Sequence, residues 1–250
     1  MNTKFSKPLI YIICIILVVV FTTGFNQGLE VDDLAYTIAI GFDKGTNNNI
    51  KLSMQFAKPV TTSEGGSSDA QPSFIHTVEA SSLSSALNLL DSFISKRINL
   101  SHCKVIVFSE EFAKNGISKE LYTLINNIQL RPDVSMVVCK CTSAEFIKKS
   151  KPTLENIVTK YYELAPKSTE YTGYTSNVKI GDFFSNLTCS TIEPYAILGG
   201  INTTSQLSDS NSFTNGDKDS DIKAGQTPLS KNSGAENLGL AIFKGDKLVR

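Results

Sequence analysis

The sequence predicts an α+β domain in which packed helices cover a mixed β-sheet. Two observations support this class: a hairpin-like pair of β-type segments near the start, and alternating β-type and amphipathic segments over residues 74–150. A charge-free apolar segment precedes both and reads as an anchor rather than as part of the domain. The 250 residues, 41% of them hydrophobic, suffice for one such domain with additional segments.

The charge balance argues against a nucleic-acid partner. The 24 basic and 24 acidic side chains cancel, and the basic residues form no cluster along the sequence. Proteins that bind nucleic acids usually carry such a cluster, because neutralising phosphate charge drives their affinity. We therefore expect no nucleic acid among the partners.

Residues 1–25 read as a signal or membrane anchor. Lys4 and Lys7 precede thirteen uncharged apolar residues, 9–21, which is the order found in secretory signals. The segment is short for a spanning helix, which needs about 20 residues. The positive flank should stay in the cytoplasm, so the rest of the chain should lie outside. The small residues at 22–24 would suit a signal peptidase; without cleavage the helix itself is the anchor, and both alternatives stay open.

The domain begins with a predicted β-hairpin. Residues 34–42 are rich in β-branched and aromatic types, residues 51–56 alternate, and residues 45–49 between them have the composition of a turn. A loop rich in Gly, Ser and Thr over 61–73 is expected to be mobile. A third strand is predicted over 74–80.

Helices and strands then alternate. Ser81 or Ser82 can cap a helix over 83–94, whose apolar residues share one stripe. A strand over 103–108 and a strand over 134–139 flank helical segments. Such strands pair in parallel across a helical crossover, whereas the hairpin is antiparallel, so the sheet should be mixed.

The helices between and after these strands have recognisable ends. Ser109 caps a short helix that Gly116 closes, and a longer helix is predicted over 117–130. Ser143 caps a further short helix that ends in lysines. The apolar face of the helix over 117–130 is formed by Leu121, Leu124, Ile125 and Ile128.

The last third of the sequence predicts two more helices, a strand and a linker. The helices cover 153–164 and 180–187, and the strand covers 193–201. Residues 202–237 contain few apolar side chains and cannot bury enough surface to offset their ordering entropy. The predicted organisation is an anchor over 1–25, an α+β domain over 29–201, a disordered linker over 202–237, and the beginning of a C-terminal domain over 238–250.

A search for chemistry finds no catalytic motif. The sequence has no phosphate-binding glycine loop, no G-x-S-x-G elbow and no H-E-x-x-H pair. His76 and His102 are the two histidines, and no serine in an elbow context accompanies them, so we interpret both as structural. Neighbouring carboxylates at Asp32-Asp33 and Glu110-Glu111 do not converge as those of a glycosidase must. We predict no catalytic residue and no cofactor.

The cysteines do not form a convincing metal or disulfide framework. Cys139 and Cys141 lie two apart in a predicted strand, which points both to one face and does not suit a mutual disulfide. A zinc site would need His102 and Cys103 as its second pair, and structural cysteines are the preferred interpretation. Gly41 and Asp43 are attributed to turn chemistry at a strand end. We predict no metal-binding residue.

Several segments, taken in order, resemble the Ger(x)C family, the C subunits of spore nutrient germinant receptors. The similar segments are 30–44 (EVDDLA followed by IAIGFDK), 97–116 with His102 before a strand, 130–138 with Arg131 in a turn, and 238–249. Members typically carry a lipid-bearing cysteine after the signal glycine, where this chain has Phe25, so lipidation at that position is not expected. Members also continue beyond the last segment, so we expect this chain to lack their C-terminal domain.

The resemblance implies a function and partners. It implies a non-enzymatic subunit, anchored at the outer face of the spore inner membrane, that acts beside the A and B membrane subunits in nutrient-triggered germination. An exported, membrane-tethered solute-binding or sensor domain is the alternative. A surface hydrolase built around His76 or His102 is a third interpretation.

Overall fold

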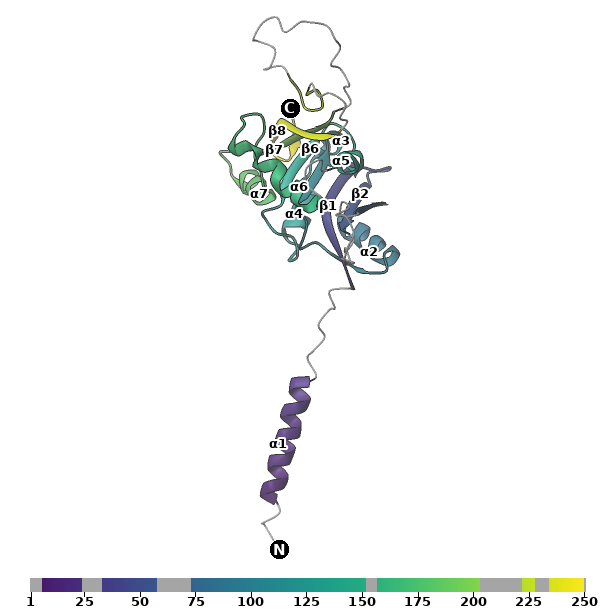
Figure 1. Ribbon diagram of the computed structural model, residues 1–250, viewed down its shortest axis with the longest axis vertical. Helices are drawn as coiled ribbons and strands as arrows, with labels where there is room; N and C mark the ends of the chain where they lie inside the picture. Colours follow the sequence, from purple (N-terminus) through teal and green to yellow (C-terminus); the bar gives the residue numbers. More distant parts are fainter. Residues whose placement is uncertain are drawn as a thin grey trace, which may run out of the picture. The chain divides into compact units, whose positions relative to one another are not determined.

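The computed structural model describes residues 6–23, 33–57, 73–151, 157–202, 222–227 and 234–249 (Figure 1). The chain divides into two units, Met1–Leu34 and Ala35–Arg250. The first contains helix α1, and the second contains the sheet with the remaining helices. Phe25 and Asp32 lie outside the described residues, as do 58–72, which contain most of the predicted mobile loop.

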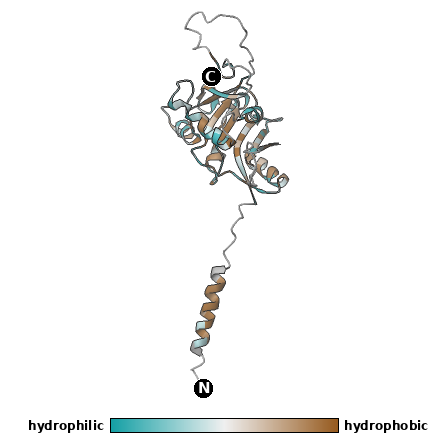
Figure 2. Cartoon of the chain, viewed as in Figure 1, coloured by the Kyte–Doolittle hydropathy of each residue, from teal (hydrophilic) through white to brown (hydrophobic). Residues whose placement is uncertain are grey.

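Helix α1 (Ser6–Thr23) is apolar around its circumference, as its colouring in Figure 2 shows. Its large apolar side chains between Leu9 and Val20 are 52–71% exposed. Among the described residues, no helix combines the length and the apolar character that crossing a membrane requires.

The described strands form one mixed sheet in the order β3-β2-β1-β5-β6-β7-β8-β9, with β4 paired to β1 off this path. Strands β1, β5, β6 and β7 are parallel, and antiparallel strands extend the sheet on both sides. The prediction of an α+β fold with a mixed sheet is thus confirmed. The strands are β1 (Leu34–Lys44), β2 (Ile50–Ala57), β3 (Ser73–Ala80), β4 (Arg97–Asn99), β5 (Val105–Ser109), β6 (Ser135–Cys139), β7 (Tyr195–Ile201), β8 (Ala235–Lys244) and β9 (Lys247–Leu248).

Helices cover both faces of the sheet. Adjacent residues of a strand point to opposite faces, and β1 shows the result. A Cβ on Gly41 would lie 2.9 Å from Ile147 of α5, whereas Phe42 packs on the other face against Phe108 and Phe112 of α3. The helices are α2 (Leu83–Phe93), α3 (Glu110–Asn115), α4 (Ser118–Ile125), α5 (Ser143–Lys149), α6 (Val158–Leu164), the 3-10 helix η2 (Ala165–Glu170) and α7 (Ile180–Thr188).

Most of the predicted helix ends are confirmed. The side chain of Ser82 accepts a hydrogen bond from the backbone N–H of Ser85, and that of Ser109 accepts one from Phe112. Gly116 ends α3 with φ +106°, a conformation that favours glycine. The cap of α5 is Thr142, whose hydroxyl accepts from Glu145 at 3.3 Å, and not Ser143 as the sequence predicted.

The helix predicted over 117–130 is shorter in the structure. It ends at Ile125, because Asn127 forms a local turn: its side-chain oxygen accepts the N–H of Gln129 at 2.9 Å, and its carbonyl accepts that of Leu130. Ile128, which was assigned to the apolar face, is 100% exposed. Strand β4 was not predicted at all.

Strand β8 extends the same sheet instead of starting a separate one. It pairs with β7 in antiparallel register, and Phe243 packs edge-to-face on Phe183 of α7 with ring centroids 4.9 Å apart. Strand β9 then pairs with β8 across the predicted turn. Residues 238–249 therefore belong to the sheet of the unit Ala35–Arg250. This pairing was not predicted because over 30 residues separate β8 from β7 in the sequence. Within 202–237, only the terminal residues 202 and 234–237 and the short segment 222–227 are described.

Candidate functional site

The strand order creates a switch point between β1 and β5. The chain leaves the carboxyl end of β1 towards β2 on one side, and leaves the adjacent carboxyl end of β5 through α3 towards β6 on the other. In open α/β sheets, ligands commonly bind outside the carboxyl ends of strands at such a point. We call the groove that lies there, with a volume of about 470 Å³, the carboxyl-end groove.

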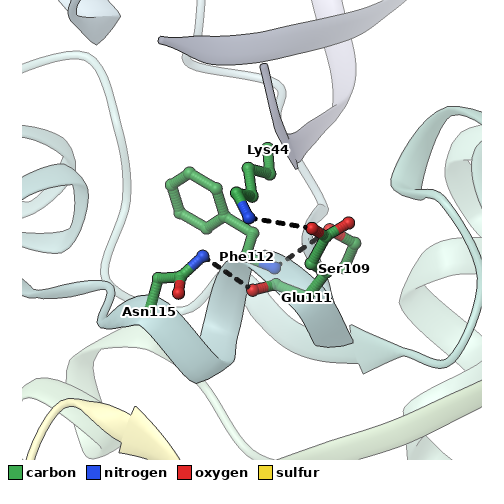
Figure 3. A network of polar contacts seen from close by, with 5 residues as sticks. All are labelled: Lys44, Ser109, Glu111, Phe112 and Asn115. Carbon is green, nitrogen blue, oxygen red and sulfur yellow. Dashed lines mark hydrogen bonds and ion pairs between the residues drawn. The ribbon is translucent and has the colours of Figure 1, made fainter. Parts of the chain in front are cut away.

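Charged side chains of both signs line this groove. Lys44 ends β1, Glu110 and Glu111 begin α3, and Lys140 follows β6. The Lys44 ammonium forms an ion pair with the Glu111 carboxylate, drawn as a dashed line in Figure 3. The two groups lie 3.0 Å apart, across the switch point. Both partners are solvent-exposed, at 44% and 71% of the side chain, so the pair contributes little to stability.

Hydrogen bonds within and at the start of helix α3 hold Glu111 in place. The hydroxyl of Ser109 accepts the N–H of Phe112, and the side chain of Asn115 donates to the carbonyl of Glu111 at 3.2 Å (Figure 3). Lys114 forms a further ion pair with Glu110 one turn earlier. The two carboxylates at the start of α3 also interact favourably with the positive end of the helix dipole. Glu110 and Glu111 are therefore each paired with a lysine.

Asp43 lies beside the groove and has a structural role that the sequence interpretation missed. It is only 5% exposed, and it accepts hydrogen bonds from the N–H and the hydroxyl of Ser143, both at 2.7 Å, and from the N–H of Ala144. Its carboxylate thus fastens the start of α5 to the end of β1. Gly41 allows α5 to come this close. The attribution of Gly41 and Asp43 to turn chemistry was wrong, because neither lies in the turn that follows β1.

Cys141 lines the groove, and Cys139 is buried. The Cys139 thiol donates to the carbonyl of Cys141 at 3.0 Å, and both cysteines are free. The pKa of Cys139 is raised, first by its hydrogen bond to the Cys141 thiol and then by burial. Burial likewise raises the pKa of Cys103 to about 12. These raised values keep the two buried thiols protonated and unreactive.

The two histidines do not meet. His76 lies on the edge strand β3, with its ring 5.2 Å from that of Phe93. His102 lies before β5, edge-to-face with Tyr36 at 4.8 Å. In the described part of the chain, no group of three or more His, Cys, Asp or Glu side chains could hold a metal ion. The prediction that the chain has no catalytic, cofactor or metal residue stays a prediction.

Asp33 and two of the lysines at the end of the helix that follows β6 are exposed. Asp33 precedes β1 and is exposed. Lys148 and Lys151 are exposed at the end of α5, as expected for lysines that end a helix in solvent. The local signal that could have revealed Asp43 is its place near the end of strand β1, after five positions without a polar side chain.

Comparisons with known proteins agree on one family. A family model described as the spore germination protein N-terminal domain matches residues 27–198. Spore germination protein KC of Bacillus subtilis (strain 168) is 26% identical over 73% of this chain and 46% of its own length. The putative spore germination protein YfkR of the same organism is 23% identical over 99% of this chain and 58% of its own length. The chain thus spans about half the length of these relatives, and no solved structure matches it.

Proposed function

The chain belongs to the spore germination protein family defined by this N-terminal domain, and from that premise we propose that it takes part in spore germination as a non-enzymatic subunit of a germinant receptor. The observation that carries the proposal is the match over residues 27–198, which begins before β1 and ends within β7. The names of both relatives describe spore germination proteins. The resemblance to the Ger(x)C family implies that the other subunits of this receptor are the A and B membrane subunits.

We propose that α1 anchors the domain at the outer face of the membrane. A helix that is apolar on all sides exposes a large apolar surface in water. Removing this surface from water is favourable by about 25 cal/mol per Å². The exposed side chains between Leu9 and Val20 therefore favour insertion into lipid. Lys4 before the helix and Lys7 in its first turn favour an orientation in which the domain lies outside.

Binding, not catalysis, is the proposed mode of action. Asp43 is committed to α5, and Glu110 and Glu111 are committed to lysines, so these carboxylates serve packing and local structure. The proposed partners are the A and B membrane subunits of the receptor. A tether raises the effective concentration of the domain near membrane partners, so weak contacts suffice for assembly.

The proposal is tested by fractionating sporulating cells and determining the intact mass of the chain. We expect a membrane-bound chain that co-purifies with polytopic A- and B-like subunits. Ile16→Lys should release it, because a lysine in the middle of an inserted helix costs about 2.5–3.5 kcal/mol. Leu89→Lys, at an exposed apolar position of α2, is the matched control and should stay bound.

One feature favours the alternative of a tethered solute-binding or sensor domain. The carboxyl-end groove lies where small ligands bind in other open sheets. A chain recovered soluble, cleaved after the apolar segment and without membrane partners would contradict the receptor proposal and support this alternative.

A further inference from the structure

A second hollow, of about 400 Å³, opens at the opposite end of the parallel strands, where β5 and β6 begin. We call it the amino-end cleft. The segments before the two strands bring together residues that lie far apart in the sequence, including His102 and Arg131 from two of the segments that carry the family resemblance. The lining residues that matter here are His102, Lys104, Arg131, Ser135, Lys167 and Lys179.

The backbone under this cleft is fixed by hydrogen bonds. Lys104 donates its N–H to Ile38 of β1, and its carbonyl accepts the N–H of Ser135. Ser135 forms an antiparallel bridge with Lys179, and the neighbouring Ile180 donates to Val134. The side chains of Lys104, Ser135 and Lys179 therefore project from adjacent, rigidly connected extended segments.

The cleft carries an excess of positive charge. Four Lys or Arg side chains and two carboxylates line it. One of the carboxylates, Glu163, is already engaged by two lysines, at 3.3 Å from Lys104 and 3.8 Å from Lys167. Of the two lining carboxylates, Asp133 remains for Arg131 and Lys179, and Asp182, which does not line the cleft, also attracts Lys179.

Lys179 is the cation that lies deepest without a direct ion pair in the described part of the cleft. Its ammonium is half-buried and donates to the hydroxyl of Ser135 at 2.9 Å. Among the described residues, no carboxylate lies within ion-pairing distance of it. Burial is the largest cause that lowers the pKa of Lys179; the charge of Lys167 lowers it further, and the more distant Asp133, Asp182 and Glu163 oppose both effects. Partial burial of a cation without a counter-ion is unfavourable unless an anion is bound.

We propose that the amino-end cleft binds a phosphate-type oxyanion, with Lys179 and Ser135 at its floor and Arg131 and Lys104 at its rim. An ammonium and a hydroxyl on the floor supply two donors, and a guanidinium supplies a planar fork that fits two phosphate oxygens. A tetrahedral anion with several acceptor oxygens satisfies more of these donors than a single carboxylate does.

The phosphate could be free or part of a lipid headgroup, and the chain connection favours the headgroup. Strand β1 runs parallel to β5, with Ala39 opposite Val105, so the chain enters the domain at the end where the cleft opens. The lipid source rests on the proposed function, because it requires α1 to lie in the membrane. The oxyanion site itself does not.

The first experiment titrates the full chain, in a neutral detergent, with inorganic phosphate by calorimetry at constant ionic strength. We expect saturable binding that Lys179→Met and Arg131→Gln each weaken about 10-fold, the equivalent of one charge-assisted hydrogen bond. The matched control is Lys44→Met with Lys51→Gln, which removes two cations at the carboxyl-end groove and should leave the affinity unchanged. Arg131 is exposed, so its variant tests the proposal even if Lys179→Met folds poorly.

The second experiment distinguishes the sources. The chain is placed in nanodiscs of phosphatidylcholine, alone or mixed equally with phosphatidylglycerol, and acetylation of each lysine is followed by mass spectrometry. Protection of Lys179 by phosphatidylglycerol without added phosphate assigns the site to a headgroup, and protection by soluble phosphate alone assigns it to a free anion. No phosphate binding by the wild-type chain in either experiment, or an equal loss in the control variant, overturns the proposal. The receptor proposal is tested separately by co-purification.

Discussion

The two ends of the parallel strands use the same kinds of side chain in opposite ways. At the carboxyl end, Asp43 is buried and accepts three hydrogen bonds from the start of α5, while Lys44 and Glu111 neutralise each other. At the amino end, Lys179 is half-buried with a hydroxyl as its partner. Polar groups whose partners come from the fold itself thus hold the structure together. A charge that the fold leaves uncompensated is the one available to a ligand.

The largest expected effect is at Asp43. Asp43→Ala leaves the N–H and hydroxyl of Ser143 without their buried acceptor, and it should lower the free energy of unfolding by about 2–4 kcal/mol. Asp182→Ala, an exposed carboxylate in the first turn of α7, is the control and should change it by less than about 0.5 kcal/mol. Denaturant titration of both variants provides the measurement. Equal effects at the two positions would contradict the structural role of Asp43 at the carboxyl end.

Gly41 tests whether close packing at the carboxyl end is required. Gly41→Ala places a methyl group 2.9 Å from the side-chain terminus of Ile147 and in contact with Ser143, so α5 must shift. We expect a loss of about 1–3 kcal/mol in the free energy of unfolding. Gly173→Ala, where no atom lies within 4 Å of the added carbon, should be nearly neutral. A neutral Gly41→Ala would mean that α5 is not fastened as tightly as Asp43 implies.

Replacing Lys179 should have the opposite effect on the free energy of unfolding. Lys179→Met should leave stability unchanged or raise it by up to about 1 kcal/mol at neutral pH, because the ammonium loses solvation on folding. The sign follows from linkage: the pKa of the folded state lies below 10.5, so the unfolded state binds more protons in the window between them. Wild-type stability therefore gains from this group as pH rises through that window, and the advantage of the variant should shrink. Unfolding curves at neutral and alkaline pH measure this; a clear loss of stability at neutral pH would identify Lys179 as structural.

The smallest expected effect is at the pair that crosses the switch point. Lys44→Met or Glu111→Gln should change the free energy of unfolding by less than about 0.5 kcal/mol, because both side chains are well exposed. Thermal melts in low and high salt measure the small residual, which salt should abolish. A loss near that of Asp43→Ala would show that this network supports the fold more than its exposure suggests.

Local patterns predicted the elements, since strand periodicity, caps and turn residues act over a few positions. The hairpin of β1 and β2, the Ser82 and Ser109 caps and the Gly116 terminus all follow from neighbouring residues. The prediction for Ile128 was wrong for a local reason as well, because the turn formed by Asn127 competes with the helix. Periodicity alone does not show where a polar side chain ends the pattern.

The sites could not be predicted, because topology creates them. Asp43 meets Ser143 from 100 residues away, and no signal in either segment specifies the other. The amino-end cleft joins segments near 102, 131 and 179 that become neighbours only when β5, β6 and the segment before α7 align. In the same way, β8 finds β7 across a long intervening segment. The sequence indicates which residues are charged but not which charges are left without partners.

The most direct test of this division is the thermal unfolding midpoint of the full chain in phosphate and in chloride at equal ionic strength, for the wild type and for Lys179→Met. A ligand that binds only the folded state raises the midpoint in proportion to its occupancy. We predict that phosphate raises the midpoint of the wild type and not that of Lys179→Met, although the variant is at least as stable in chloride. An equal rise in both proteins, or no rise in either, would contradict the assignment of the amino end as the binding end.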